Sequence, residues 1–331
     1  MEQDWIRQLP KTDLHCHLDG SMDPNTVFTL LKETGFTIDG DQLEKELMVS
    51  EDCESLEEYL KRFDLPLRCL QTEAGLKQAA FDLLKNAATE NVKYLEVRFA
   101  PMSSALKGLG CKQIIESVLR GIQAAEQQWD IKASVIVCAM RHYSKAQNEQ
   151  MLYCAREYLG EGVCALDLAG DEGAFPTKDF RELFQLAKRL DMPFTIHSGE
   201  CGSILNVEEA INLGAKRLGH GIALSKDSNL MKQCRDKRIG IELCPTSNFQ
   251  TKAVTAWEEY PLRQFLKEGL LATVNTDNRT VSNTTITKEL TKLKENMGIT
   301  EDEIRRLLIN SIEISFAADD IKHSLIGEMG S

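Results

Sequence analysis

The hydrophobic positions of the chain fall into eight short runs, most of them followed by a stretch whose composition suits a helix. Each run is ~5–8 residues long, and most are rich in Val, Ile or Leu, which is typical of buried parallel strands. The predicted strands are Thr12–Leu18, Lys93–Ala100, Lys132–Met140, Val163–Ala169, Phe194–Ser198, Arg217–Gly221, Ile239–Cys244 and Leu271–Thr276. Eight such alternations predict an α/β fold of the (β/α)8 TIM-barrel type rather than an open sheet.

The segments between these strands predict an outer layer of helices. The clearest are Glu73–Thr89, Cys111–Gln127, Lys178–Leu190, Val207–Leu213 and Pro261–Glu268, and a final helix, Glu301–Ser315, is expected to close the bottom or side of the barrel. The strip Gly35–Tyr59 is polar and irregular and interrupts the first crossover. Residues 35–70 are therefore an insertion, either a lid over the barrel mouth or an ordinary surface insertion. With no linker or composition break, residues 1–331 are expected to form one domain.

Charge and composition narrow the class of partner. The chain has 39 basic and 51 acidic residues and a net charge of −12, so its field repels polyanions. That argues against a nucleic-acid or anionic-membrane partner but leaves a neutral small molecule open. No signal peptide and no apolar run near the ~18 residues of a membrane span is visible. The ten cysteines contain no CxxC pair, so reduced thiols and a cytoplasmic location are expected.

Candidate chemistry begins in the first predicted strand, at His15-Cys16-His17. Alternate side chains of a strand share a face, so the two imidazoles project together and Cys16 projects toward the helical layer, where it is expected to pack. Two imidazoles at the end of a barrel strand can hold one divalent metal ion. Because an HxH pair in a strand is also common without a metal, this motif alone leaves both possibilities open.

Three further polar residues end predicted strands: His197 the fifth, His220 the sixth and Asp277 the eighth. Four of the six histidines thus fall at strand ends, together with Asp277 and, shortly after His197, Glu200. The active sites of these barrels lie at the carboxyl ends of the strands. A buried structural histidine would explain one such residue, whereas the whole set predicts a reactive centre.

The residue types suggest separate tasks within this centre. Three imidazoles and one carboxylate form a ligand set suited to one zinc ion per chain, namely His15, His17, His197 and Asp277. A bound metal lowers the pKa of water towards ~7 and so yields hydroxide at neutral pH. His220 is expected to orient and help deprotonate that water, with Asp277 beside it, while Glu200 exchanges a proton with a substrate nitrogen. These parts suit the hydrolytic deamination of an aromatic amidine.

Five strings of the sequence resemble adenosine deaminases of the metal-dependent amidohydrolase superfamily. They are LPKTDLHCHLDG at 9–20, DLAGDE at 167–172, HSGE at 197–200, GHG at 219–221 and NTD at 275–277, in the order of that family. The resemblance covers most of the chain. It implies a zinc enzyme that converts adenosine, and 2′-deoxyadenosine, to inosine and ammonia as hydroxide attacks purine C6 and Glu200 protonates N1.

The resemblance also implies substrate contacts that spacing does not provide. Asp19 would hydrogen-bond the ribose 5′-hydroxyl, the backbone N–H of Gly170 would bond a purine ring nitrogen, and His17 would lie against the substrate as well as the metal. Two structural alternatives stay open. Asp19 could instead cap the following helix, and Gly170 could be a plain turn glycine.

Asn278 departs from one common form of the family motif, in which two aspartates are adjacent and the second, protonated, donates to purine N7. The amide of Asn278 can donate to the same acceptor without a protonation requirement, so its pH dependence should differ. Tyr59–Phe63 occupies the place of the family's apolar lid, although the same stripe could be the core face of a helix.

Three rival functions remain at this point. The first is an adenine deaminase of the same superfamily, whose free-base substrate has no ribose for Asp19 to bind. A binuclear hydrolase would need a bridging lysine in the fourth strand, and 163–168 contains none. An inactive nucleoside-binding relative would not need the complete set of acid, base and ligand residues. The PCxxC ligands of cytidine-type deaminases are missing, and so are phosphate-binding glycine motifs, which disfavours AMP as a substrate.

Overall fold

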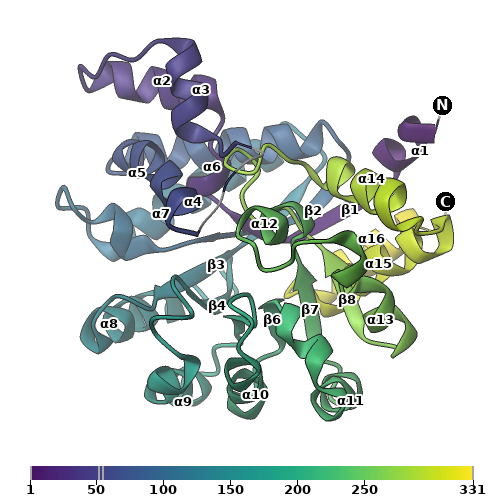
Figure 1. Ribbon diagram of the computed structural model, residues 1–331. Coiled ribbons are helices and arrows are strands. Elements are labelled where there is room, and N and C mark those ends of the chain that lie inside the picture. The colour runs from purple at the N-terminus through teal and green to yellow at the C-terminus, as the bar shows by residue number, and fades with distance from the viewer. Residues whose placement is uncertain (1, 51–52, 54–55, 330–331) are drawn as a thin grey trace.

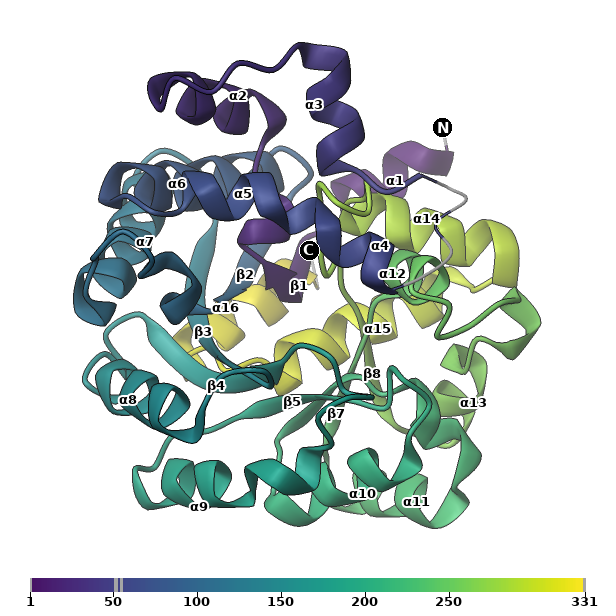
Figure 2. The same cartoon turned by 60° about the vertical axis from the view of Figure 1, so that its left-hand side comes forward.

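The computed structural model describes residues 2–50, 53 and 56–329. Its strands form two four-stranded parallel sheets, ordered β1-β2-β3-β4 and β5-β6-β7-β8. Bridges between Leu166 and Phe194 and between Cys16 and Asp277 join the sheets at both edges, so the strands close into a ring (Figures 1 and 2). The strands are β1 (Lys11–His17), β2 (Val92–Phe99), β3 (Lys132–Met140), β4 (Val163–Ala169), β5 (Thr195–Ser198), β6 (Arg217–His220), β7 (Gly240–Leu243) and β8 (Leu271–Val274). The predicted eight-stranded barrel is confirmed, with strand bounds within two residues of those expected.

Helices surround this ring, as the sequence predicts. They include α6 (Glu73–Ala88), α7 (Cys111–Glu126), α8 (Lys145–Arg156), α9 (Arg181–Arg189), α10 (Ile204–Leu213), α11 (Ser228–Asp236), α13 (Leu262–Lys267) and α14 (Ile286–Met297). The predicted helix Lys178–Leu190 is divided into a 3₁₀ turn, Thr177–Phe180, and α9. None of the helices in the described ranges combines the length and apolarity needed to cross a bilayer.

The two ends of the chain add helices outside the repeating units. At the C-terminal end, α15 (Glu301–Ile314) packs against β8 and β1, and α16 (Asp319–Met329) packs on α15. At the other end, α1 (Glu2–Gln8) contacts α14. The predicted helix Glu301–Ser315 is therefore confirmed, and it covers the barrel beside its first and last strands.

The insertion before β2 is more regular than its polar sequence suggests. It contains α3 (Gly40–Leu47), α4 (Leu56–Leu60) and α5 (Asp64–Cys69), and α3 stands out from one corner of the barrel together with the preceding α2 (Pro24–Glu33) (Figure 1). The expectation of an irregular strip was wrong for α3, an eight-residue helix that buries only Leu43 and Leu47 and is otherwise polar. Residues 51–52 and 54–55 of the strip lie outside the described residues.

The end of this insertion lies beside the main pocket. Tyr59, Leu60, Phe63, Asp64 and Leu67 line the main pocket of the barrel, so residues 58–67 cover its mouth. In Figure 2, α4 and α5 lie across that end of the barrel. This part of the insertion therefore lies at the pocket, and its action as a lid stays a prediction.

The interior of the barrel holds charged side chains as well as aliphatic ones. Arg98 lies 2.9 Å from both Asp167 and Glu242, and Arg217 donates to Glu242 at 2.6 Å and pairs with Glu96. All five side chains are fully buried, so each charge depends on its partners for compensation. Sequence periodicity did not predict this layer, because charged residues in a strand usually signal a solvent-facing side.

Candidate active site

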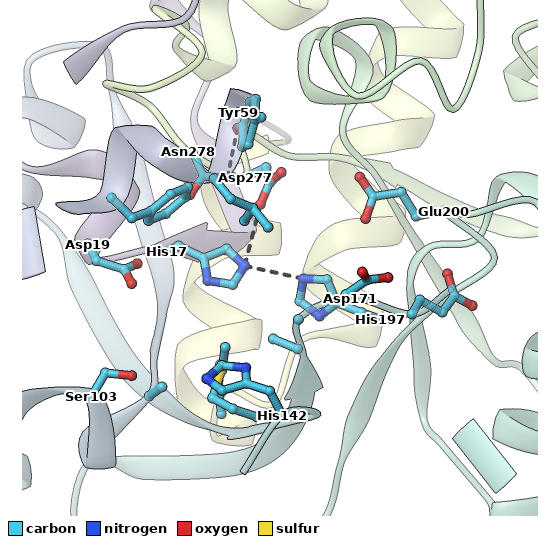
Figure 3. A pocket seen from close by; sticks show the side chains of 18 of the residues that line it. His17, Asp19, Tyr59, Ser103, His142, Asp171, His197, Glu200, Asp277 and Asn278 are labelled. Carbon is cyan, nitrogen blue, oxygen red and sulfur yellow. Dashed lines mark hydrogen bonds and ion pairs between the residues drawn. The ribbon is translucent and has the colours of Figure 1, made fainter. Parts of the chain in front are cut away.

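A cavity of about 380 Å³ opens at the carboxyl ends of the strands and contains most of the predicted site residues (Figure 3). His17 ends β1, His197 lies in β5, and Asp277 follows β8. The chain bends sharply at His220 and Asp277, whose φ angles are +60° and +58°. Such left-handed conformations are uncommon for residues with a side chain and concentrate at functional sites.

The structure brings the predicted metal-ligand candidates into contact. Donor atoms of His15, His197, His220 and Asp277 all lie within 4.8 Å of one another. His17 Nε2 lies 3.2 Å from His197 Nε2 and 3.4 Å from Asp277 Oδ1, at the edge of the same group. The predicted set included His17 and left His220 aside. All five residues lie close together, so distance alone does not distinguish His17 from His220 as a metal ligand.

Carboxylates on the far side of two imidazoles fix how these rings face the cavity. His15 Nδ1 lies 2.8 Å from Glu242 Oε2, and His197 Nδ1 lies 2.8 Å from Asp167 Oδ2. In both rings Nε2 is left facing the cluster, and His15 Nε2 lies 3.4 Å from Asp277 Oδ1. A carboxylate behind the ring is the usual support of a histidine that binds a metal.

Buried nitrogen atoms that face one another need a cation or a proton between them. The donor set of imidazole nitrogens and one carboxylate oxygen matches the preference of zinc and related divalent ions. The residues present therefore fit a divalent metal ion, and Cys16 does not take part. Its side chain is fully buried in the hydrophobic core, as predicted.

The protonation states also suit metal binding. Burial lowers the pKa of His15 to about 4 and holds the pKa of His17 well below its ordinary value. Burial alone would raise the pKa of Asp277, but its hydrogen bond with His15 and the neighbouring histidines hold that pKa well below its usual range. Neutral imidazoles beside an ionised carboxylate are the forms that ligate a metal. His197 differs, since Asp167 outweighs burial and raises its pKa.

Glu200 and His220 form a second pair at the same rim. His220 Nε2 lies 3.6 Å from Glu200 Oε2, and the hydroxyl of Thr251 donates to Glu200 Oε1 at 3.0 Å. On the other side of the ring, Asn248 Nδ2 lies 2.9 Å from His220 Nδ1. Because Tyr260 donates to the amide oxygen of Asn248 at 3.3 Å, the amide nitrogen faces His220 and places the proton of the neutral ring on Nε2. This arrangement favours the orienting role of His220 over the deprotonating one.

Asp19 lies in a 3₁₀ turn, Asp19–Ser21, beside the cavity. Its carboxylate accepts only the neighbouring N–H of Gly20, at 3.0 Å, among the hydrogen bonds of the described residues. The cap of α2 is Asp23, which accepts from Asn25 N–H at 2.9 Å. The alternative of Asp19 as a helix cap is therefore wrong. Burial raises the pKa of Asp19 to about 6.

Gly170 follows β4 and lines the cavity. Its φ is +104°, a conformation that side-chain-bearing residues rarely adopt, so the turn itself requires glycine. A Cβ at this position would meet only ordinary contacts, the nearest 3.5 Å away, so it is the backbone angle that restricts the residue. The contact of its N–H with a purine stays a prediction.

Asn278 is held by the cover of the pocket. Its amide nitrogen donates to the Tyr59 hydroxyl at 2.9 Å (Figure 3). That hydroxyl in turn lies 2.8 Å from Ser282 Oγ. The amide oxygen of Asn278 is buried against Gly20, where a Cβ would approach it to 1.8 Å. Tyr59 was predicted only as part of an apolar lid. Nothing in the sequence signalled this polar contact, because it joins residues 219 positions apart.

Comparison of the sequence with known proteins assigns the chain to a family. The family model for adenosine deaminase matches residues 10–330. The chain belongs to the adenosine deaminase family. An adenosine deaminase of Enterococcus faecalis is 43% identical over 327 residues, which is 98% of this chain and 97% of that protein. The predicted membership is confirmed.

Solved structures of other proteins share the fold. Adenine deaminase from Arthrobacter aurescens superposes with a TM-score of 0.88 at 23% identity, covering 97% of this chain and 98% of its own. An amidohydrolase from Burkhoderia ambifaria, solved with bound Zn, has a TM-score of 0.90 at 20% identity and covers 99% and 91% of the two chains. At these identities the similarity shows a shared barrel fold only. The substrate has to be inferred from the residues of the site.

Proposed function

We propose that this protein is a zinc-dependent adenosine deaminase, which hydrolyses adenosine and 2′-deoxyadenosine to inosine and ammonia. One observation carries the proposal: the buried group of His15, His197, His220 and Asp277, with Glu200 Oε2 only 3.6 Å from His220 Nε2. Ligand candidates and a proton donor thus share one cavity. The full-length similarity to relatives named adenosine deaminase supports the same conclusion.

His15, His17, His197 and Asp277 would hold one zinc ion per chain. His220 is assigned to orientation instead, since its Nε2 proton makes it a donor and faces Glu200. When bound, such an ion lowers the pKa of water to ~7 and so supplies the nucleophile at neutral pH. The zinc named for the structure from Burkhoderia ambifaria is consistent with this choice.

The remaining steps belong to side chains of this protein. His220 donates its Nε2 proton in a hydrogen bond to the attacking water and fixes it below purine C6. Asp277, held ionised by its histidine neighbours, receives a water proton. Glu200 delivers a proton to N1, so that the ring accepts the incoming oxygen. The C6–O bond forms, the C6–N6 bond breaks, and the leaving nitrogen takes the second water proton to depart as ammonia. Asp277 then loses its proton to solvent and Glu200 regains one, which restores the starting state of both side chains.

The cavity favours a neutral nucleoside over a nucleotide. None of the described residues that line the cavity is Lys or Arg. Six of them carry carboxylates: Asp19, Asp64, Asp171, Glu172, Glu200 and Asp277. A 5′-phosphate would enter this negative field without a cationic partner. Asp19 instead suits a hydroxyl donor such as the ribose 5′-OH, and Asn278 and Gly170 are assigned to the purine ring.

The test measures the loss of ultraviolet absorbance as adenosine becomes inosine, on protein whose metal content has been quantified. We expect turnover with about one zinc per chain, its loss on chelation and its recovery when zinc is restored. Adenine and AMP are measured in parallel. Faster turnover of adenine would replace the proposal with an adenine deaminase, and two ions per chain would contradict the single-metal site.

A further inference from the structure

Glu172, in the loop after β4, has no role in the proposed reaction steps, yet it contacts the backbone next to Glu200. Its side chain is 4% exposed. One carboxylate oxygen accepts the backbone N–H of Gly199 at 2.6 Å, and the other accepts the N–H of Cys201 at 3.1 Å. These two residues are the immediate neighbours of Glu200. The carboxylate therefore spans the residue that carries the proposed proton donor.

The turn that Glu172 contacts is tight. Gly199 has a φ of +87°, and a Cβ there would lie 2.7 Å from Val207 Cγ2, so the turn is tight and requires glycine. Buried N–H groups in such a turn need an acceptor. Glu172 supplies a charged one, which forms shorter and stronger bonds than a neutral oxygen.

The backbone of Glu172 is itself fixed. Its carbonyl oxygen accepts from Asn206 Nδ2 at 3.4 Å, and Asn206 Oδ1 accepts the N–H of Thr177 at 2.9 Å. On the opposite side of the loop, the carbonyl of Gly199 accepts the N–H of Ala223 at 3.1 Å. The loop is thus fastened between the segments after β4 and after β6.

We propose that Glu172 is a positioning residue for Glu200 in the deamination reaction. The inference rests on the proposed function. By holding both backbone neighbours of Glu200, it keeps that carboxylate in reach of Thr251 and His220, where N1 of the substrate must arrive. Because the proton has to travel along a short hydrogen bond, a shift of about 1 Å in Glu200 can reduce turnover by about 100-fold.

The first test is Glu172→Gln, which keeps the size of the side chain. Its amide oxygen can accept one N–H, while its NH2 group opposes the other. We expect kcat for adenosine to fall about 100-fold, with KM changed less than about threefold and metal content equal to that of the wild type. Glu172→Asp, which keeps the charge on a shorter side chain, should retain more activity than Gln.

A ligand without the reacting nitrogen separates positioning from general disorder of the pocket. In 1-deazaadenosine a C–H replaces N1, so the nucleoside binds without needing Glu200. Its affinity should be the same for wild type and Glu172→Gln. Combining Glu172→Gln with Glu200→Gln should lower kcat no further than Glu200→Gln alone, because the residue to be positioned is already inactive.

Asp227→Ala is a control for loss of a carboxylate that accepts two backbone N–H groups, here both on Oδ1. Asp227 accepts from Asn229 and Leu230 at 2.9 and 3.0 Å at the start of α11, outside the residues that line the cavity. This change should lower Tm and leave kcat unaltered.

Several outcomes would overturn the inference: full kcat in Glu172→Gln, multiplicative losses in the double variant, or equal losses of metal and 1-deazaadenosine affinity. Wild-type protein that does not deaminate adenosine would instead overturn the proposed function, and with it the role assigned here. An active wild type with an unaffected Glu172→Gln variant removes this inference alone.

Discussion

Replacement of Arg98 by Met tests whether the charged layer inside the barrel supports the site above it. Arg98 is fully buried and donates to Asp167 and Glu242 at 2.9 Å each, and to the carbonyl of Leu14. Asp167 and Glu242 are the carboxylates behind His197 and His15. Arg98 therefore compensates both acceptors that orient the candidate ligands.

The expected magnitude follows from the partners left behind. Glu242 keeps Arg217, but Asp167 has Arg98 as its only guanidinium partner among the ion pairs of the described residues. Removing one member of a buried pair costs about 3–5 kcal/mol. Against a total stability of about 5–15 kcal/mol, this is a large fraction. Loss of the support behind metal ligands typically weakens metal affinity by 10–100-fold, or about 1.4–2.7 kcal/mol.

Two measurements separate these effects: the urea midpoint of the metal-free protein, and zinc affinity by competition with a chromophoric chelator. Glu96→Gln is the control. Glu96 pairs with Arg217 in the same charged layer, but it does not support either His15 or His197. It should lower stability and leave zinc affinity nearly unchanged. Wild-type zinc affinity in Arg98→Met, or equal weakening in both variants, would refute the reasoning.

Three other predictions concern the reacting residues directly. Glu200→Gln should retain zinc and lose turnover by about 10²–10⁴-fold, because only the proton donor is removed; metal analysis beside kcat checks this, and loss of zinc would contradict it. His15→Ala should lose metal and activity together, since His15 Nε2 is buried within the ligand group; stoichiometric zinc in the variant would exclude a ligand role. Burial raises the pKa of Asp19 to about 6, so Asp19 becomes ionised, and a stronger acceptor for the 5′-hydroxyl, as pH rises through that value. The ratio of kcat/KM for adenosine to that for 5′-deoxyadenosine should therefore increase across pH 6 and be low and flat in Asp19→Ala; a ratio independent of pH in the wild type would argue against the contact.

The alternation of hydrophobic runs determined the barrel, because buried parallel strands are rich in apolar residues and leave that mark along the chain. Strand ends then located the centre, since parallel strands of a closed barrel deliver their carboxyl ends to one rim. His15, His197, His220, Asp277 and Glu200 could thus be placed together from order alone. Helix α3 was missed because a short peripheral helix that buries two leucines in an otherwise polar sequence has the composition of a surface loop.

Tertiary structure decided what surrounds these residues. That Glu242 and Asp167 orient the imidazoles, that Tyr59 holds Asn278, and that Glu172 grips the loop of Glu200 all depend on contacts between distant segments. Such contacts leave no local pattern, because a buried charged residue in a strand has the same letter as a solvated one. Asp23 rather than Asp19 caps α2, a choice made by the path of the backbone and not by residue type. The sequence thus determined which groups can react, whereas packing determined how each one is held, because orientation and desolvation arise only when separate strands and loops meet.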